Sequence, residues 1–217
     1  MIVLNLKSYQ ASIDKALFFT DIASEAVADT GVRIIICPPA LFLREAAERF
    51  SDVFAQHVDP EEPGAHTGSI SAAMLKAAGI KGSLVNHSEK RIPSTEKLKK
   101  TIESLHVSGL ESIVCAASTK EAVSIANNSP AFVAVEPPEL IGSGVSVSNS
   151  KPEIIINSVK AVKEVNHRIT VLCGAGVSNR EDVRKSLELG AEGVLVSSAF
   201  VNAKDPKEFL SDLVSVF

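Results

Sequence analysis

The chain has 217 residues, of which 45% are hydrophobic and 22% are charged, and its net charge at neutral pH is −4. This length allows one sizeable core, and the acidic balance argues against a general surface for nucleic acids or anionic membranes. No apolar stretch reaches the roughly 18 residues that a membrane helix needs, and the first residues lack the features of an export signal. We therefore expect a cytoplasmic protein whose partners are small molecules and copies of itself.

Short apolar runs alternate along the chain with longer segments of helical periodicity. Strands are predicted at residues 2–6, 32–37, 53–58, 83–86, 112–116, 132–136, 169–173 and 193–196. Helices are predicted within residues 13–28, 40–50, 70–78, 95–106, 120–126, 152–165, 180–189 and 206–216. The strand segments are continuous runs of Val, Ile and Leu, as is typical of parallel strands covered on both faces. The sheet is therefore predicted to be parallel.

Helix boundaries are marked by capping residues. Ser or Asp followed three residues later by Glu, a pattern that satisfies free N–H groups at a helix start, occurs at Ser118/Glu121, Ser150/Glu153, Ser178/Glu181 and Asp205/Glu208. Gly79, Gly109 and Gly190 stand where three helices are expected to end.

Eight strand–helix units follow one another without a linker. This order favours a closed (β/α)8 barrel, one domain over residues 1–217, above an open doubly wound sheet, because a barrel has no exposed edge strand. The chain is short for this fold, so some helices should be short. A barrel with such thin cover would gain from burying its outer surface in an oligomer.

Cysteine and histidine spacing gives no sign of a metal site. Cys37, Cys115 and Cys173 each close an apolar run, and we expect them to be reduced and buried, with a catalytic thiol as the alternative. The histidines do not fall at metal-ligand spacing and no His-Glu-x-x-His motif occurs. We expect neither a metal nor a cofactor.

A lone carboxylate ends the sixth predicted strand. Glu136 follows an apolar run and precedes Pro137-Pro138 and a Gly142-Ser143-Gly144 tail. Burial would raise the pKa of this carboxyl group, as a general base working near neutrality requires, and the following loop has the hinges of a closing lid. The alternative is a strand-capping glutamate before an ordinary loop.

Two other strand ends carry polar groups that would meet Glu136 at the mouth of a barrel. Alternation along the first strand sends Asn5 and Lys7 to the same side, where they suit an anionic substrate, although a lysine at such a place is usually solvated. The fourth strand runs into His87, and a helical turn starting at Ser88 would keep its imidazole neutral. A satisfied histidine in a surface loop is the alternative.

Small residues end the seventh and eighth strands, at Gly174-Ala175-Gly176 and at Ser197-Ser198 before a short helical turn. They let backbone N–H groups approach an anion, and barrels often bind phosphate at this place. By itself, however, a Gly-x-Gly pattern most often marks a tight turn.

Together these motifs resemble the triosephosphate isomerase family, in its compact archaeal branch. The resemblance runs in order along the whole chain, through Asn5-x-Lys7, Ala55-Gln56-His57-Val58, Gly64-Ala65-His66-Thr67-Gly68, Asn86-His87-Ser88-Glu89-Lys90-Arg91, Val135-Glu136-Pro137, Ile141-Gly142-Ser143-Gly144, Gly174-x-Gly176 and Ser197-Ser198.

The resemblance implies interconversion of dihydroxyacetone phosphate and glyceraldehyde 3-phosphate in glycolysis and gluconeogenesis. Glu136 would move a proton between C1 and C2, neutral His87 would polarise the carbonyl group, and Asn5 and Lys7 would stabilise the enediolate. Glu89 would orient Lys7. The substrate would further contact Leu6, Ile141, Gly142, Gly176, Ser197 and Ser198.

The resemblance also implies a homo-oligomer, a tetramer in archaeal relatives, with a dimer as the alternative. Two other functions remain open at this point: a different phosphate-binding barrel enzyme, and a barrel that binds a phosphorylated metabolite without catalysis. Neither gives a reason for Asn5, His87 and Glu136 to occur together.

Overall fold

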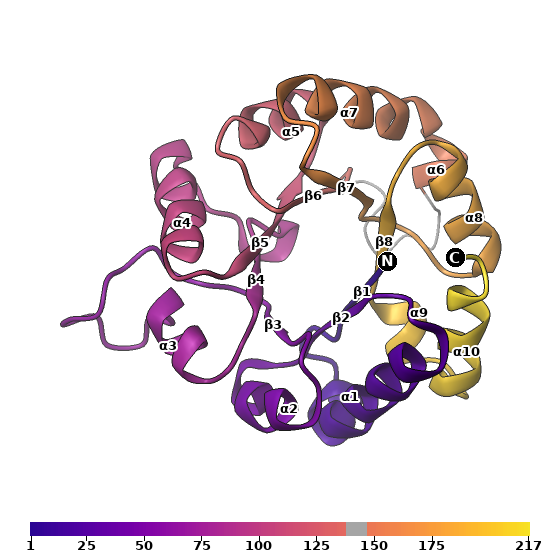
Figure 1. Ribbon diagram of the computed structural model, residues 1–217, viewed down its shortest axis with the longest axis horizontal. Helices are drawn as coiled ribbons and strands as arrows, with labels where there is room; N and C mark the ends of the chain where they lie inside the picture. The colour runs from indigo at the N-terminus through magenta and orange to yellow at the C-terminus, as the bar shows by residue number, and fades with distance from the viewer. Residues whose placement is uncertain (138–146) are drawn as a thin grey trace.

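The computed structural model describes residues 1–137 and 147–217, in which strands and helices alternate (Figure 1). The strands are β1 (Ile2–Asn5), β2 (Ile34–Cys37), β3 (Phe54–Ala55), β4 (Gly82–Val85), β5 (Glu111–Ala116), β6 (Phe132–Val135), β7 (Thr170–Cys173) and β8 (Gly193–Val196). The α-helices are α1 (Gln10–Thr30), α2 (Leu43–Arg49), α3 (Ala72–Ala77), α4 (Thr95–Val107), α5 (Thr119–Ala126), α6 (Val147–Ser150), α7 (Pro152–Val165), α8 (Arg180–Glu188), α9 (Ser198–Val201) and α10 (Pro206–Val214). Two short 3-10 helices are η1 (Ala40–Phe42) and η2 (Ser88–Lys90).

The strands form one parallel sheet that curls into a nearly closed barrel. Its order is β2-β1-β8-β7-β6-β5-β4-β3, so that β2 and β3 are the two ends. A parallel bridge between Ile36 and Val53 joins those ends, with Ile36 N donating to Asp52 O at 3.1 Å. Helices surround the ring of strands in Figure 1. The predicted (β/α)8 fold is confirmed.

Two apolar cores explain why the strands are apolar at most positions on both faces. One buried cluster draws residues from all eight described strands and from no helix, so it fills the barrel interior; it includes Val3, Ile35, Phe54, Leu84, Ile113, Phe132, Leu172 and Leu195. The other joins the remaining strand residues, such as Ile2 and Leu4, to the helices. Because successive side chains alternate between the faces, Asn5 lies on the same face of β1 as Val3.

The strand predicted at residues 53–58 is the one that differs most, because β3 ends at Ala55. Directly after it, the side-chain amide of Gln56 donates to the carbonyl oxygens of Cys37 and Lys7, each at 3.0 Å. A side chain here takes the place of backbone pairing with the neighbouring strand.

The helix starts agree with the capping patterns in two cases. The Ser118 hydroxyl accepts from Glu121 N at 3.2 Å, and the Asp205 carboxylate accepts from Glu208 N at 3.0 Å. Helix α8 begins at Arg180 as predicted, but its N-cap is Asn179 and not Ser178, and the Asn179 side chain accepts from Asp182 N at 3.0 Å.

The predicted Ser150/Glu153 box is wrong. Ser150 closes the short helix α6, and α7 begins at Pro152 after Lys151. Proline lacks an N–H group and has a helical φ, so it starts a helix without needing a serine cap. The glycines expected at helix ends are confirmed: Gly79, Gly109 and Gly190 follow α3, α4 and α8 with φ angles of 81°, 73° and 94°.

Among the described residues, no helix is both long enough and apolar enough to cross a membrane.

Candidate active site

A pocket opens where the carboxyl ends of the strands meet. Its walls are Lys7, Tyr9, His87, Glu136, Gly174, Ala175, Gly176, Val177, Ser178, Leu195, Ser197, Ser198 and Ala199. An adjoining pocket shares Lys7 and His87 and is also lined by Asn5, Gln56 and Glu89. The structure thus brings together the polar residues predicted at the ends of the first, fourth, sixth, seventh and eighth strands.

Glu136 is buried at the bottom of this arrangement, directly after β6, with 3% of its surface exposed. Its Oε2 atom has no hydrogen-bond partner among the described residues. Burial raises the pKa of Glu136 to about 7, against the smaller opposing effects of the Cys115 thiol and the Lys7 charge. A carboxyl group with this pKa exchanges protons near neutral pH, as a general base must.

Gly174 makes room for this carboxylate. A Cβ atom at residue 174 would lie 2.4 Å from Glu136 Cγ and 3.0 Å from the carbonyl oxygen of Val135. Only glycine therefore allows β7 to end this close to the Glu136 side chain.

His87 faces Glu136 across the pocket, with Nε2 at 3.6 Å from Glu136 Oε1. Its other ring nitrogen, Nδ1, accepts a hydrogen bond from Glu89 N at 3.2 Å. A nitrogen that accepts carries no proton, so this bond assigns the proton of the neutral ring to Nε2. Burial and the charge of Lys7 lower the pKa of His87, while Glu89 acts in the opposite direction. The helical turn expected after His87 is present as η2.

Lys7 is held by three contacts. Its Nζ atom lies 2.7 Å from Glu89 Oε1, its N–H donates to Asn5 Oδ1 at 3.0 Å, and its carbonyl oxygen accepts from the Gln56 amide. Its φ of 49° lies in the left-handed region, which is uncommon for lysine. The side chain is 14% exposed, so the ammonium group is directed into the mouth instead of into solvent.

The opposite wall of the pocket is made of small residues. Gly176 has a φ of 73°, Ser198 begins α9, and the buried Ser197 hydroxyl has no hydrogen-bond partner in the described part of the chain. Backbone N–H groups and a free hydroxyl at this wall suit an anionic group of a ligand.

Three predicted site residues are not placed in the pocket. Ile141 and Gly142 lie outside the described residues. Leu6 is fully buried, its N–H donates to Cys37 O at 3.1 Å, and its side chain belongs to the core between strands and helices. Leu6 could therefore contact a substrate only through its backbone, whose N–H already bonds Cys37 and whose carbonyl oxygen accepts from the Ser12 hydroxyl.

Reasoning from single residues did not find Gln56, which entered only through the resemblance. The signal available was its position as a polar residue inside an otherwise apolar predicted strand.

The cysteines behave as buried apolar groups. Cys37, Cys115 and Cys173 are free and buried, and burial raises the pKa of Cys173 to about 11. A thiol with this pKa is protonated at neutral pH and is a poor nucleophile. Across residues 1–137 and 147–217, no three His, Cys, Asp or Glu side chains are grouped as metal ligands.

A family model and the similar proteins of known name all point to the same family. A family model described as "Triosephosphate isomerase" matches residues 1–216. The triosephosphate isomerase of Methanothermus fervidus is 46% identical over 217 residues, which cover 99% of this chain and 97% of the relative. Those of Methanocaldococcus jannaschii and Archaeoglobus fulgidus are 43% and 45% identical, over 99% and 100% of this chain and 98% and 97% of their own lengths.

Proposed function

The chain belongs to the triosephosphate isomerase family, and we propose that Glu136, His87, Lys7 and Asn5 carry out its reaction at the mouth of the barrel. The enzyme is an intramolecular oxidoreductase that interconverts dihydroxyacetone phosphate and D-glyceraldehyde 3-phosphate. The observation that carries the residue assignment is the buried Glu136 carboxylate, which has an unpartnered oxygen and faces a neutral imidazole at 3.6 Å.

The chemistry assigned to Glu136 is a proton shuttle. Its carboxylate takes a proton from C1 of dihydroxyacetone phosphate, the electrons of that C–H bond form the C1–C2 double bond, and the carbonyl electrons move onto the C2 oxygen. The same carboxyl group then returns the proton to C2, while the proton of the C1 hydroxyl passes to the C2 oxygen, so that the aldehyde forms at C1 and a hydroxyl group forms at C2. A pKa near 7 suits both directions of transfer.

The developing charge on the substrate oxygens is assigned to His87, Asn5 and Lys7. His87 donates from Nε2–H, because Nδ1 is occupied by Glu89 N. Lys7 supplies a positive charge and is steadied by Glu89 at 2.7 Å. Donors held in place before the reaction stabilise a transition state without reorganising.

The phosphate group is assigned to the small-residue wall, at Gly176, Ser197 and Ser198. Ile141 and Gly142 would close over it from the segment outside the described residues. The backbone of Leu6 completes the proposed contacts near Lys7.

We also propose an oligomeric state, a cellular location and a metabolic role for the enzyme. We assign the whole chain to one barrel domain that forms homotetramers in the cytoplasm and acts in glycolysis and gluconeogenesis, with a homodimer as the alternative assembly. Exposed apolar side chains on the outer surface support an oligomer: Leu41 and Val107 are 93% and 83% exposed. Analytical ultracentrifugation at assay concentration distinguishes the two assemblies.

The assignment of Glu136 is tested with Glu136→Gln in a coupled assay on dihydroxyacetone phosphate. We expect kcat to fall by about 10²–10⁴-fold or more, because a general base contributes this much, while the affinity for a phosphate-bearing analogue is retained. The matched control is Glu188→Gln on the exposed face of α8, which should keep wild-type turnover. Wild-type-like turnover by Glu136→Gln would refute the assignment, and a barrel that merely binds a phosphorylated metabolite would show no isomerisation in any form.

A further inference from the structure

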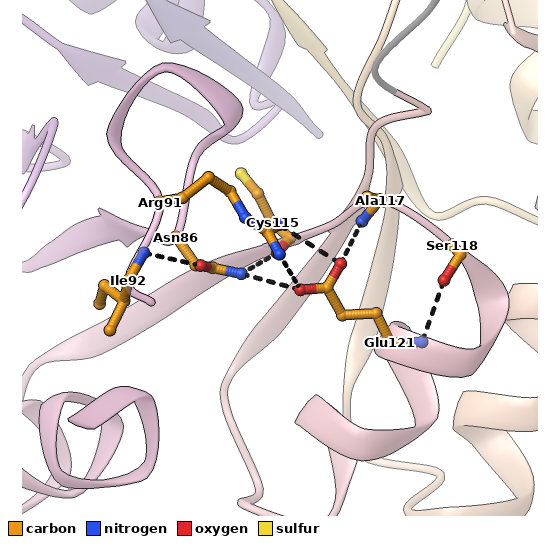
Figure 2. Close-up of polar contacts among 7 residues, drawn as sticks. All are labelled: Asn86, Arg91, Ile92, Cys115, Ala117, Ser118 and Glu121. Atoms are coloured by element: carbon orange, nitrogen blue, oxygen red, sulfur yellow. Dashed lines mark hydrogen bonds and ion pairs between the residues drawn. The ribbon is translucent and has the colours of Figure 1, made fainter. Parts of the chain in front are cut away.

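A second polar cluster adjoins His87 on the side of β5 and α5 (Figure 2). It consists of Asn86, Arg91, Ile92, Cys115, Ala117, Ser118 and Glu121, and we call it the loop clamp. These residues come from the end of β4, from the loop that carries His87, from the end of β5 and from the start of α5. None of them lines the pocket that contains Glu136.

Asn86 is the centre of the loop clamp. It is 1% exposed and has a φ of 62°, a conformation that asparagine tolerates better than most residues. Its Oδ1 atom accepts from Ile92 N at 3.1 Å, and its Nδ2 group donates to Cys115 O at 3.0 Å and to Glu121 Oε1 at 3.2 Å. One side chain therefore joins the two ends of the loop at residues 87–91 and fastens them to β5 and α5.

Glu121 fastens the same loop from the other side. Its N–H is capped by the Ser118 hydroxyl at 3.2 Å, and its carboxylate accepts from Ala117 N at 2.7 Å. Both Nη atoms of Arg91 also donate to this carboxylate. Burial acts in the opposite direction, but the hydrogen bonds from Arg91 and Ala117 outweigh it and lower the pKa of Glu121. The carboxylate is thus ionised and committed to these donors at neutral pH.

The loop clamp determines which ring nitrogen of His87 carries the proton. The tautomer of His87 depends on the bond from Glu89 N to Nδ1, and that N–H is directed by the backbone of η2. The clamp ties the chain on both sides of η2, while η2 itself is held by the bond from Lys90 N to His87 O at 2.8 Å and by the ion pair of Glu89 with Lys7. If the two ends of the loop at residues 87–91 were released, the Glu89 N–H would no longer point at His87 Nδ1. Nδ1 could then carry the proton, and Nε2 would no longer be a donor.

We propose that Asn86 and Glu121 are positioning residues of the isomerase, which hold His87 with its Nε2–H directed into the pocket. This inference rests on the proposed role of His87 in the reaction. The alternative is that the clamp only strengthens the barrel, and the two readings predict different kinetics.

The decisive experiment measures Asn86→Gly in two backgrounds, wild type and His87→Gln. Glycine keeps the positive φ of residue 86 and removes all three side-chain hydrogen bonds. In the wild-type background we expect kcat to fall by about 10–100-fold, with KM changed less than about twofold, because misplacing a catalytic group by about 1 Å costs up to about 10²-fold. In the His87→Gln background the same change should lower the residual kcat by less than about twofold, because the group that Asn86 positions is absent.

Two measurements guard against a purely structural effect. Asp205→Ala removes the cap of α10, which does not line the pocket, and should lower stability by an amount typical of a lost cap without changing kcat. Nitrogen-15 NMR of His87 should show one tautomer, with the proton on Nε2, in the wild type and a mixture in Asn86→Gly. If Asn86→Gly does not fold, Glu121→Gln replaces it, since glutamine keeps the shape but has no charge for Arg91 and one acceptor oxygen in place of two.

The outcomes separate the two proposals. An equal loss of kcat in both backgrounds, or an unchanged tautomer, would overturn the role of the loop clamp and leave the assignment of His87 intact. Full activity of His87→Gln alone would instead overturn the assignment of His87.

Discussion

Charged side chains are paired at the amino ends of the barrel strands, whereas a buried carboxylate at the carboxyl ends has an oxygen without a partner in the described residues. At the amino ends of the strands, Arg33 donates to Asp52 at 2.9 Å and to Glu111 at 2.6 Å, and its guanidinium lies 5.5 Å from the centre of the Phe132 ring. At the carboxyl ends, the Glu136 carboxylate is more deeply buried than any of these groups and has an oxygen without a partner in the described residues.

The backbone shows part of the same contrast: among the described non-glycine residues, left-handed φ angles occur at two residues of the carboxyl ends and at one residue of the amino ends, Ser129 with a φ of 51°. Lys7 and Asn86, at the carboxyl ends, have φ angles of 49° and 62°, which cost an L-residue free energy. At the amino ends, Lys163 and Glu192 form an ion pair at 2.6 Å, and the terminal amine donates to Glu192 O at 3.3 Å. The amino end thus supplies stability, while the carboxyl end keeps unsatisfied groups that a substrate can use.

The largest predicted effect is at the carboxyl end, where Lys7→Ala removes the cation that faces the substrate. We expect kcat/KM to fall by about 10³-fold, with binding and rate lost together, because a preorganised charge in a closed site contributes to both. Steady-state kinetics in the coupled assay measure the loss.

The matched control for Lys7→Ala is Lys90→Ala, which removes an exposed lysine of the neighbouring η2. Its kcat/KM should stay within about twofold of wild type, because its charge is screened by solvent. Equal losses in the two variants would mean that overall charge, and not the position of Lys7, matters. Unchanged KM and kcat in Lys7→Ala would remove Lys7 from the site.

The same substitution, glycine to alanine, can be made at each end of the barrel, at Gly174 at the carboxyl end and at Gly193 at the amino end. In Gly174→Ala the new Cβ would meet Glu136 Cγ at 2.4 Å, and in Gly193→Ala it would meet the carbonyl oxygen of Met1 at 2.5 Å. Each variant should lose about 1–3 kcal/mol of unfolding free energy through overpacking. Only Gly174→Ala should also lower kcat, by about 10-fold or more, since it displaces the Glu136 side chain.

Urea unfolding and the coupled assay on both glycine variants provide the measurement. A normal kcat in Gly174→Ala, or a reduced kcat in Gly193→Ala, would contradict the assignment of catalysis to the carboxyl end alone.

The smallest predicted effect is at the amino end, where Arg33→Met leaves Asp52 and Glu111 without their shared cation. Their side chains are 26% and 38% exposed, so solvent screens part of the loss and we expect about 1–2 kcal/mol lower stability. Turnover should be unchanged below the unfolding temperature. The control is Arg44→Met on the exposed surface of α2, and a loss of kcat in Arg33→Met would show that the amino end contributes to catalysis.

The sequence alone was sufficient to predict the barrel, because apolar runs, helical periodicity and capping residues are local signals. It also predicted that Glu136 would be buried at a strand end and that η2 would follow His87, because both follow from an apolar run that stops abruptly. The common side of Asn5 and Lys7 followed from alternation along β1.

Long-range partners could not be predicted in this way. Lys7 and Glu89 are 82 residues apart in sequence, and Asn86 and Glu121 are 35 apart, so no local pattern links them. The early end of β3 depends on where the Gln56 amide finds carbonyl acceptors, which only the folded chain determines. The start of α7 at Pro152 was predicted, but the Ser150 cap was not found, because a proline at the first helical position needs no serine cap.

Glu136 lowers the stability of the folded protein in return for activity, and this loss is measured by the stability of Glu136→Gln as a function of pH. In the folded protein the pKa of Glu136 is raised from 4.5 to about 7, so its contribution to stability is fully present below about pH 4.5 and is lost as the pH rises through 7.

The measurement is urea unfolding of wild type and Glu136→Gln near pH 4 and near pH 8, together with turnover at the higher pH. We predict similar stabilities near pH 4, and near pH 8 an inactive variant that is more stable than wild type by roughly 3 kcal/mol, at about 1.4 kcal/mol per unit of pKa. A Glu136→Gln variant that is no more stable than wild type near pH 8, or one that remains active, would contradict the claim.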